Sequence, residues 1–147
     1  MIQSALSLVF HVWRPAHVRY RRVITFLVVF GAMDAVWLSI MVPRIYLPTI
    51  GDMAASPMRI LPAIIFYLLY AAGALFFTSA RAEQTGAAFV YGVLFGAVAY
   101  ATYDLTNYAT LRNWNLSLTL IDMFWGATAT GVAATAAYMV MRYVAER

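Results

Sequence analysis

Four apolar windows, each about as long as a membrane is thick, constrain the fold of this 147-residue chain more than any other feature. They cover residues 23–42, 60–78, 87–108 and 118–141. A hydrocarbon core of about 30 Å takes roughly 20 apolar residues of helix. Lipid offers no partner for backbone polar groups, and runs this long and uniform are not barrel strands. The sequence therefore predicts an all-α fold, a four-transmembrane-helix bundle in a lipid bilayer.

Composition supports a membrane location and excludes several kinds of chemistry. The chain is 64% hydrophobic and 11% charged, too little polar surface to cover a water-soluble domain of this size. It has no cysteine, which excludes disulfides and thiolate sites. His11 and His17 both precede the first window, so the spans hold no histidine base or metal ligand. We predict no cofactor and no metal.

All ten basic residues are arginine, and they lie near the ends of the windows. On one side of the membrane we place Arg14, Arg19, Arg21, Arg22, Arg81, Arg142 and Arg147, and on the other Arg44, Arg59 and Arg112. The positive-inside rule then predicts that both termini are cytoplasmic. Because these arginines form no stripe on a soluble face, the basic composition does not indicate a nucleic-acid partner.

The connections suggest how the chain is divided. Residues 1–22 are interpreted as a cytoplasmic arm, whose Leu6, Val9, Phe10 and Trp13 would let it lie along the headgroups as an interfacial helix. Residues 23–147 form the transmembrane domain. We expect an outer loop over residues 44–59, while the short links 81–84 and 113–117 make consecutive spans antiparallel neighbours.

Three acids lie inside the spans, namely Asp34, Asp104 and Asp122. An aspartate at mid-bilayer costs about 2.5–3.5 kcal/mol on insertion scales, so such residues normally face the bundle interior and mark a site. Counted along their helices at about 1.5 Å per residue, all three fall in the outer half of the membrane. We expect them to converge on a pocket that opens outward.

Helical spacing gives these acids polar and aromatic neighbours. In the third span Asp104 and Asn107 share a face with tyrosines, and the first and fourth spans both contain the pattern D-x-x-W. The candidate residues for a ligand or proton site are Asp34, Trp37, Tyr103, Asp104, Asn107, Asp122 and Trp125. A purely structural interpretation stays open, because tyrosine and tryptophan donors also satisfy carboxylates between helices and form interfacial belts.

Several segments resemble a bacterial family of predicted membrane proteins, the domain of unknown function 2177. They are DAVWL (34–38), FYLLYAAG (66–73), FGAVAYATYDLTNYATLRNW (95–114) and IDMFWG (121–126). The resemblance implies a four-span protein of the bacterial inner (cytoplasmic) membrane with no assigned activity. Family members begin just before the first span, so the preceding residues resemble an extension. Relatives carry leucine after the Asn of TYDLTN, where this chain has Tyr108.

The leading functional hypothesis is a small carrier or conduit whose outward-facing site binds or transports a proton or a small polar solute. Two alternatives remain: an enzyme of membrane lipids that uses an aspartate as general base, and an accessory or assembly subunit of a larger membrane complex. A bundle of four helices is narrow, so a homodimer is also an expected partner arrangement. No catalytic residue is assigned.

Overall fold

The computed structural model describes residues 16–79 and 81–145, and these residues form a helical bundle without strands. Its main helices are α2 (Ala16–Met41), α4 (Ile60–Phe77), α5 (Thr85–Thr110) and α6 (Leu116–Ala145). Four helical segments in this part of the chain are long and apolar enough to cross a membrane. The predicted all-α class with four transmembrane helices is confirmed.

The first span is longer than the apolar window suggested. After α2 the chain continues through a π-helical turn (Val42–Tyr46) into the short helix α3 (Leu47–Ile50), and a 3₁₀ turn (Gly51–Met53) follows. The prediction of a loop beginning at residue 44 was therefore wrong for residues 44–50. Pro43 and Pro48 lie in the first turns of their segments, where the missing N–H of a proline is tolerated.

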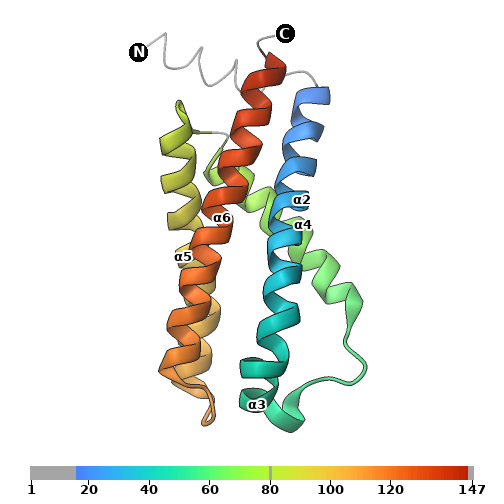
Figure 1. Ribbon diagram of the computed structural model, residues 1–147, viewed down its shortest axis with the longest axis vertical. Coiled ribbons are helices and arrows are strands. Elements are labelled where there is room, and N and C mark those ends of the chain that lie inside the picture. Colours follow the sequence, from blue (N-terminus) through green and yellow to red (C-terminus); the bar gives the residue numbers. More distant parts are fainter. Residues whose placement is uncertain (1–15, 80, 146–147) are drawn as a thin grey trace.

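The predicted N-terminal arm falls largely on residues 1–15, which lie outside the described residues. Residues 16–22, assigned to the arm from sequence, belong to α2 instead. The first turn of α2 and the last turn of α6 lie at the same end of the bundle (Figure 1). The link between α4 and α5 lies at that end too, so the helices alternate in direction and place the described arginines as the sequence predicted.

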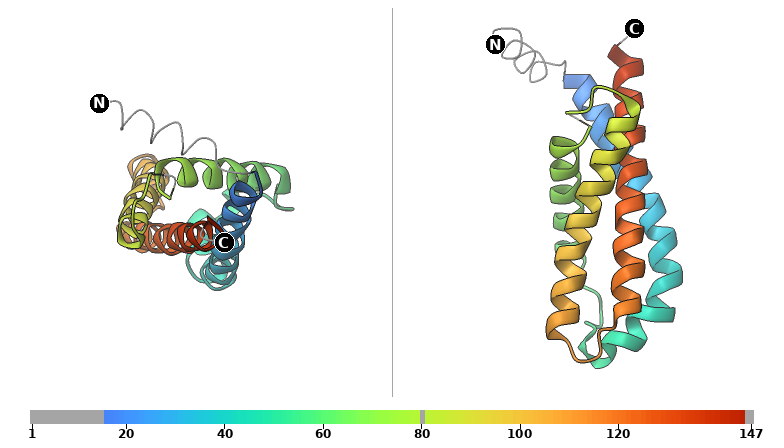
Figure 2. Two further views of the ribbon diagram at one scale, coloured as in Figure 1. Left: turned by 90° about the horizontal axis from the view of Figure 1, so that it is seen from above. Right: turned by 90° about the vertical axis from the view of Figure 1, so that its left-hand side faces the viewer.

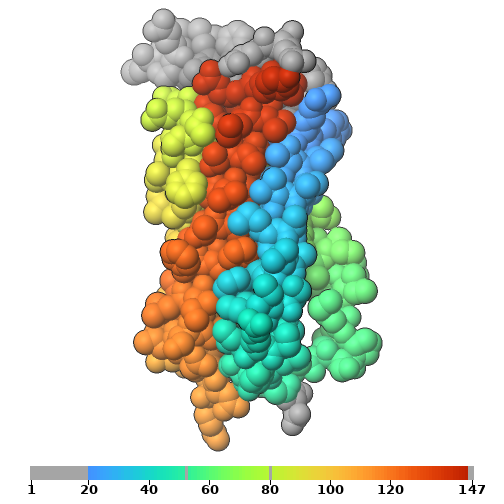
Figure 3. All heavy atoms as spheres, viewed as in Figure 1, coloured from blue at the N-terminus to red at the C-terminus, as the bar shows by residue number. Residues whose placement is uncertain are grey.

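The four helices do not pack equally. Seen end-on, α6 lies between α5 and α2, while α4 crosses the remaining side obliquely (Figure 2). Contacts of α6 with α5 and with α2 dominate the bundle, whereas α4 contacts its neighbours at few points. The lower end of α4 diverges from α2, as the ribbon and the space-filling view both show (Figures 1 and 3). This divergence leaves room between the helices on the α4 side.

Small residues bring α5 and α6 together. Gly92 and Gly96 of α5 are buried against α6, and a Cβ added at Gly92 would lie 2.8 Å from Gly131 Cα. A Cβ at Gly96 would overlap the Gly126 carbonyl oxygen. Close backbone approach of this kind drives helix association in lipid, where no hydrophobic force acts between helices. The seam fixes the register of α5 against α6, and with it the positions of their polar residues.

Candidate functional site

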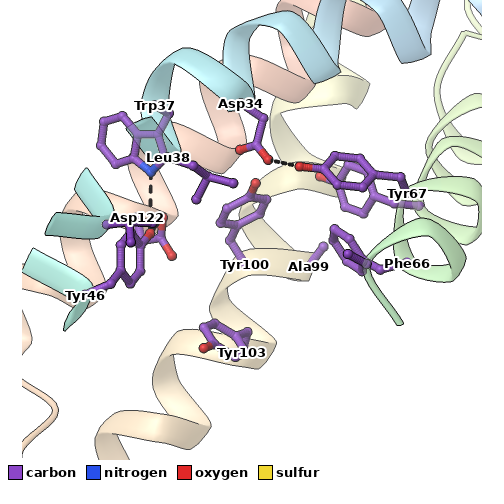
Figure 4. Close-up of a pocket in the computed structure, with 13 residues that line it drawn as sticks. Asp34, Trp37, Leu38, Tyr46, Phe66, Tyr67, Ala99, Tyr100, Tyr103 and Asp122 are labelled. Atoms are coloured by element: carbon purple, nitrogen blue, oxygen red, sulfur yellow. Dashed lines mark hydrogen bonds between the residues drawn. The ribbon is translucent and has the colours of Figure 1, made fainter. Parts of the chain in front are cut away.

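A cavity of about 470 Å³ lies between the four helices, in the half of the bundle away from the first turn of α2. Its lining combines two carboxylates with tyrosine hydroxyls and several apolar side chains (Figure 4). The lining residues are Asp34, Trp37, Leu38, Val42, Tyr46, Ala63, Phe66, Tyr67, Tyr70, Ala99, Tyr100, Tyr103 and Asp122. Every main helix contributes, so the cavity depends on the assembled bundle.

Asp34 occupies the α2 wall of this cavity and is only 6% exposed. The Tyr67 hydroxyl on α4 donates a hydrogen bond to its Oδ2 (Figure 4). The Trp125 indole on α6 donates to Oδ1 at 3.4 Å. One carboxylate therefore connects three helices, and Tyr67 supplies a polar tie for the sparsely packed α4.

Asp122 lies at the cavity wall formed by α6 and is 4% exposed. The Tyr46 hydroxyl donates a hydrogen bond to its Oδ1, and Trp37 Nε1 donates to that hydroxyl at 3.4 Å. Tyr46 comes from the π-helical turn, a distortion that often occurs at functional sites because it redirects side chains. The turn brings the Tyr46 hydroxyl from the end of the first span to Asp122.

The two tryptophans of the D-x-x-W patterns stack on each other across the α2–α6 interface. The ring centroids of Trp37 and Trp125 are 4.5 Å apart and the rings are nearly parallel, at 3°. Each indole is hydrogen-bonded, directly or through one hydroxyl, to the acid of the opposite helix. Trp125 donates to Asp34 directly, and Trp37 is linked to Asp122 through the Tyr46 hydroxyl. In each D-x-x-W pattern the tryptophan is therefore linked to the aspartate of the other helix and not to its own, which we call the crossed arrangement.

Asp104 lies close to this group but is not part of the cavity lining. It is fully buried on α5, at 0% exposed. Neither of its carboxylate oxygens has a hydrogen-bond donor among the described residues. The side chain beside it is Asp122, with which it interacts directly. The structure thus places two acids side by side at the α5–α6 seam.

The two remaining predicted residues, Tyr103 and Asn107, also lie on α5. Tyr103 lines the cavity and packs edge-on against Trp114, with ring centroids 5.6 Å apart. The Trp114 indole in turn donates to Thr119 Oγ1 at 3.1 Å, which anchors the turn into α6. Asn107 is half-buried, interacts with the Tyr103 hydroxyl and does not line the cavity. Asn107 therefore supports Tyr103 at the rim of the site.

Sequence reasoning missed several aromatic residues that complete the cavity. They are Tyr46, Phe66, Tyr67 and Tyr70, whereas Tyr100, which also lines the cavity, is one of the tyrosines that helical spacing placed on the face of Asp104. Tyr46 was assigned to a loop, while Tyr67 and Tyr70 lie in an apolar run without a charged neighbour. The hydroxyl groups of Tyr67 and Tyr70 lie in the middle of an apolar helix, where each needs a hydrogen-bond partner inside the bundle. This feature of the sequence could have identified the two tyrosines.

Among the described residues, no group of three or more histidine, cysteine or acidic side chains is placed to hold a metal ion. None of the lining residues is basic. The cavity is therefore an acidic and aromatic pocket surrounded by lipid-facing helices.

Comparison with known proteins gives one family. The family model of predicted membrane proteins, DUF2177, matches residues 20–139, which include the first three spans and all but the end of the fourth. No curated protein matches the chain, and no solved structure matches it.

Proposed function

We propose, from the premise that the chain belongs to the DUF2177 family of predicted membrane proteins, that it binds a small organic cation in the cavity. A protonated or quaternary amine fits this description. The observation that carries the proposal is the composition of the cavity wall. It contains Asp34 and Asp122, and it contains no basic side chain to neutralise them.

Electrostatics favours a positively charged ligand at this position. A carboxylate removed from water interacts strongly with an opposite charge, because the surrounding dielectric constant is low. Acids inside membrane spans accordingly tend to mark the path or binding site of a substrate or ion. The tyrosine hydroxyls on Asp34 and Asp122 orient the carboxylates without removing their charge. Both carboxylates are therefore oriented before a cation binds.

The aromatic walls favour an organic cation over a bare ion. Aromatic rings attract ammonium groups through their faces, and cages of such rings recognise alkylated amines. Phe66, Tyr67, Tyr100 and Tyr103 surround the cavity together with Trp37. A volume of about 470 Å³ is in the range of small-molecule pockets and far exceeds what one inorganic ion needs.

The position of the cavity suggests a role in transport. It lies in the half of the bundle opposite the arginine-rich end, which the positive-inside rule places in the cytoplasm. We therefore infer an outward-facing site in the inner membrane from which a small polar solute is carried. Asp34, Trp37, Tyr103, Asp104, Asn107, Asp122 and Trp125 are proposed to form or support it.

Tryptophan fluorescence tests binding directly, because Trp37 lines the cavity and stacks on Trp125. Purified protein in detergent is titrated with alkylammonium ions of increasing size, and with neutral alcohols of matched shape. We expect a saturable change with the ammonium ions alone. An equal response to the alcohols, or no saturable response to any ammonium ion, would overturn the proposal.

A further inference from the structure

Asp104 is a buried acid without a hydrogen-bond donor among the described residues, and it lies outside the lining of the proposed cation site. Its side chain is 0% exposed and does not reach the cavity wall. Neither oxygen has a donor among the described residues. Buried polar groups are nearly always hydrogen-bonded, and buried charges are paired. An ionised, unpartnered Asp104 would contradict both rules, so something must supply the missing positive charge or hydrogen.

The groups around Asp104 limit what can provide this positive charge or hydrogen-bond donor. From α6 it is faced by Asp122, whose Oδ1 accepts from Tyr46. The other titratable groups that interact with this acid pair are Tyr46 of the π-helical turn, Tyr100 and Tyr103 of α5, and Asp34 of α2. None of these described neighbours is basic. An arginine therefore does not neutralise the pair within the described part of the chain.

We propose that Asp104 and Asp122 bind one proton between them. One carboxyl carries the proton and donates it to the free oxygen of the other, which stays ionised. Two carboxylates in contact cannot both stay charged in a low dielectric, and a single shared proton resolves the conflict. It also provides the donor that Asp104 lacks. The proton comes from water and needs no other reactant.

The pair also meets the cavity, because Asp122 belongs to both. Resting on the proposed function, a cation that binds beside Asp122 would neutralise the pair in place of the proton. Binding should then release a proton, and the site would exchange one positive charge for another. Such exchange is the coupling step that a proton-driven antiporter requires.

Infrared spectroscopy tests the proton site without any ligand. The full-length protein, reconstituted in lipid at neutral pH, should show the carbonyl stretch of a protonated aspartic acid, identified by its shift after ¹³C-aspartate labelling. The band should vanish in Asp104→Asn and also in Asp122→Asn, because each asparagine amide donates to the remaining carboxylate and leaves it ionised. Asp34→Asn and Glu83→Gln should keep it.

Three results would overturn the shared proton. The wild-type protein could show only ionised aspartates, or the band could persist in one of the two variants. The band could also appear only in sodium-free buffer, which would mean that a sodium ion neutralises the pair in place of the proton. Persistence in one variant would assign the proton to a single acid. Because the wild-type spectrum alone contains the other two tests, the proposal stays falsifiable even if a variant fails to fold.

Proton release tests the coupling. Alkylammonium ions are added to weakly buffered protein containing a pH-sensitive dye, and about one proton per bound cation should appear. Wild-type protein that binds the cation without releasing a proton would overturn the coupling. If no cation binds but the infrared band is present, the proposed function fails and the proton site stands.

Discussion

The indole of Trp125 on α6 donates a hydrogen bond to the carboxylate of Asp34 on α2, at 3.4 Å. These residues lie 91 positions apart in the sequence. Their contact belongs to the crossed arrangement, in which each tryptophan is hydrogen-bonded, directly or through Tyr46, to the acid of the other helix. The stacked indoles lie beside the cavity and close the α2–α6 interface. Interface and binding site are therefore built from the same side chains.

Trp125→Phe separates the hydrogen bond from the stacking, since phenylalanine keeps a ring but has no N–H. Interhelical hydrogen bonds in membranes are worth about 0.6–2 kcal/mol, and we expect a loss of stability in this range. Thermal unfolding in detergent measures it. Phe124→Leu is the control, because Phe124 is 75% exposed on the same helix. Equal losses in both variants would show that the Asp34 contact contributes nothing.

Tyr46→Phe removes the donor that the π-helical turn brings to Asp122. A hydrogen bond to a charged group is worth about 1.5–3 kcal/mol, so the variant should unfold at a clearly lower temperature. Tyr91→Phe on the exposed face of α5 serves as the matched control and should unfold like the wild type. A stable Tyr46→Phe protein would mean that the turn is not needed to hold Asp122.

Gly96→Ala tests the α5–α6 seam. The added methyl group would collide with the Gly126 carbonyl and with the Thr130 side chain, so α5 and α6 must separate. Overpacking of this kind costs about 1–3 kcal/mol. Gly31→Ala is the control, because nothing lies within 4 Å of its added Cβ. It should be neutral or gain up to about 1 kcal/mol from helix propensity, and equal behaviour of the two would argue against the seam.

The absence of cysteine makes the orientation directly measurable. Single cysteines are introduced as Asn113→Cys and Glu83→Cys, two exposed positions in the links at opposite ends of the bundle. A membrane-impermeant maleimide should label the cysteine at position 113 in intact cells. It should label the one at position 83 only after lysis. The reverse pattern would place the cavity on the cytoplasmic side.

The sequence allowed the four spans to be predicted because lipid imposes length and hydrophobicity on any crossing helix. Helical spacing likewise placed Asp34 and Trp37 on one face. The partners across helices could not be found this way, since Trp125 reaches Asp34 only through the packing of α6 on α2. Tyr46 was missed because Pro43 and Pro48 are usually loop signals, whereas here both begin helical turns.

Titration calorimetry of aspartate variants measures whether Asp34 and Asp122 together attract a cation into the cavity. An alkylammonium ion that binds the wild type should bind Asp34→Asn and Asp122→Asn at least tenfold more weakly. Glu83→Gln, which removes one negative charge at an exposed position away from the cavity, should bind like the wild type. Unchanged affinity in both aspartate variants, or an equal loss in Glu83→Gln, would mean that the two carboxylates of the cavity do not hold the cation.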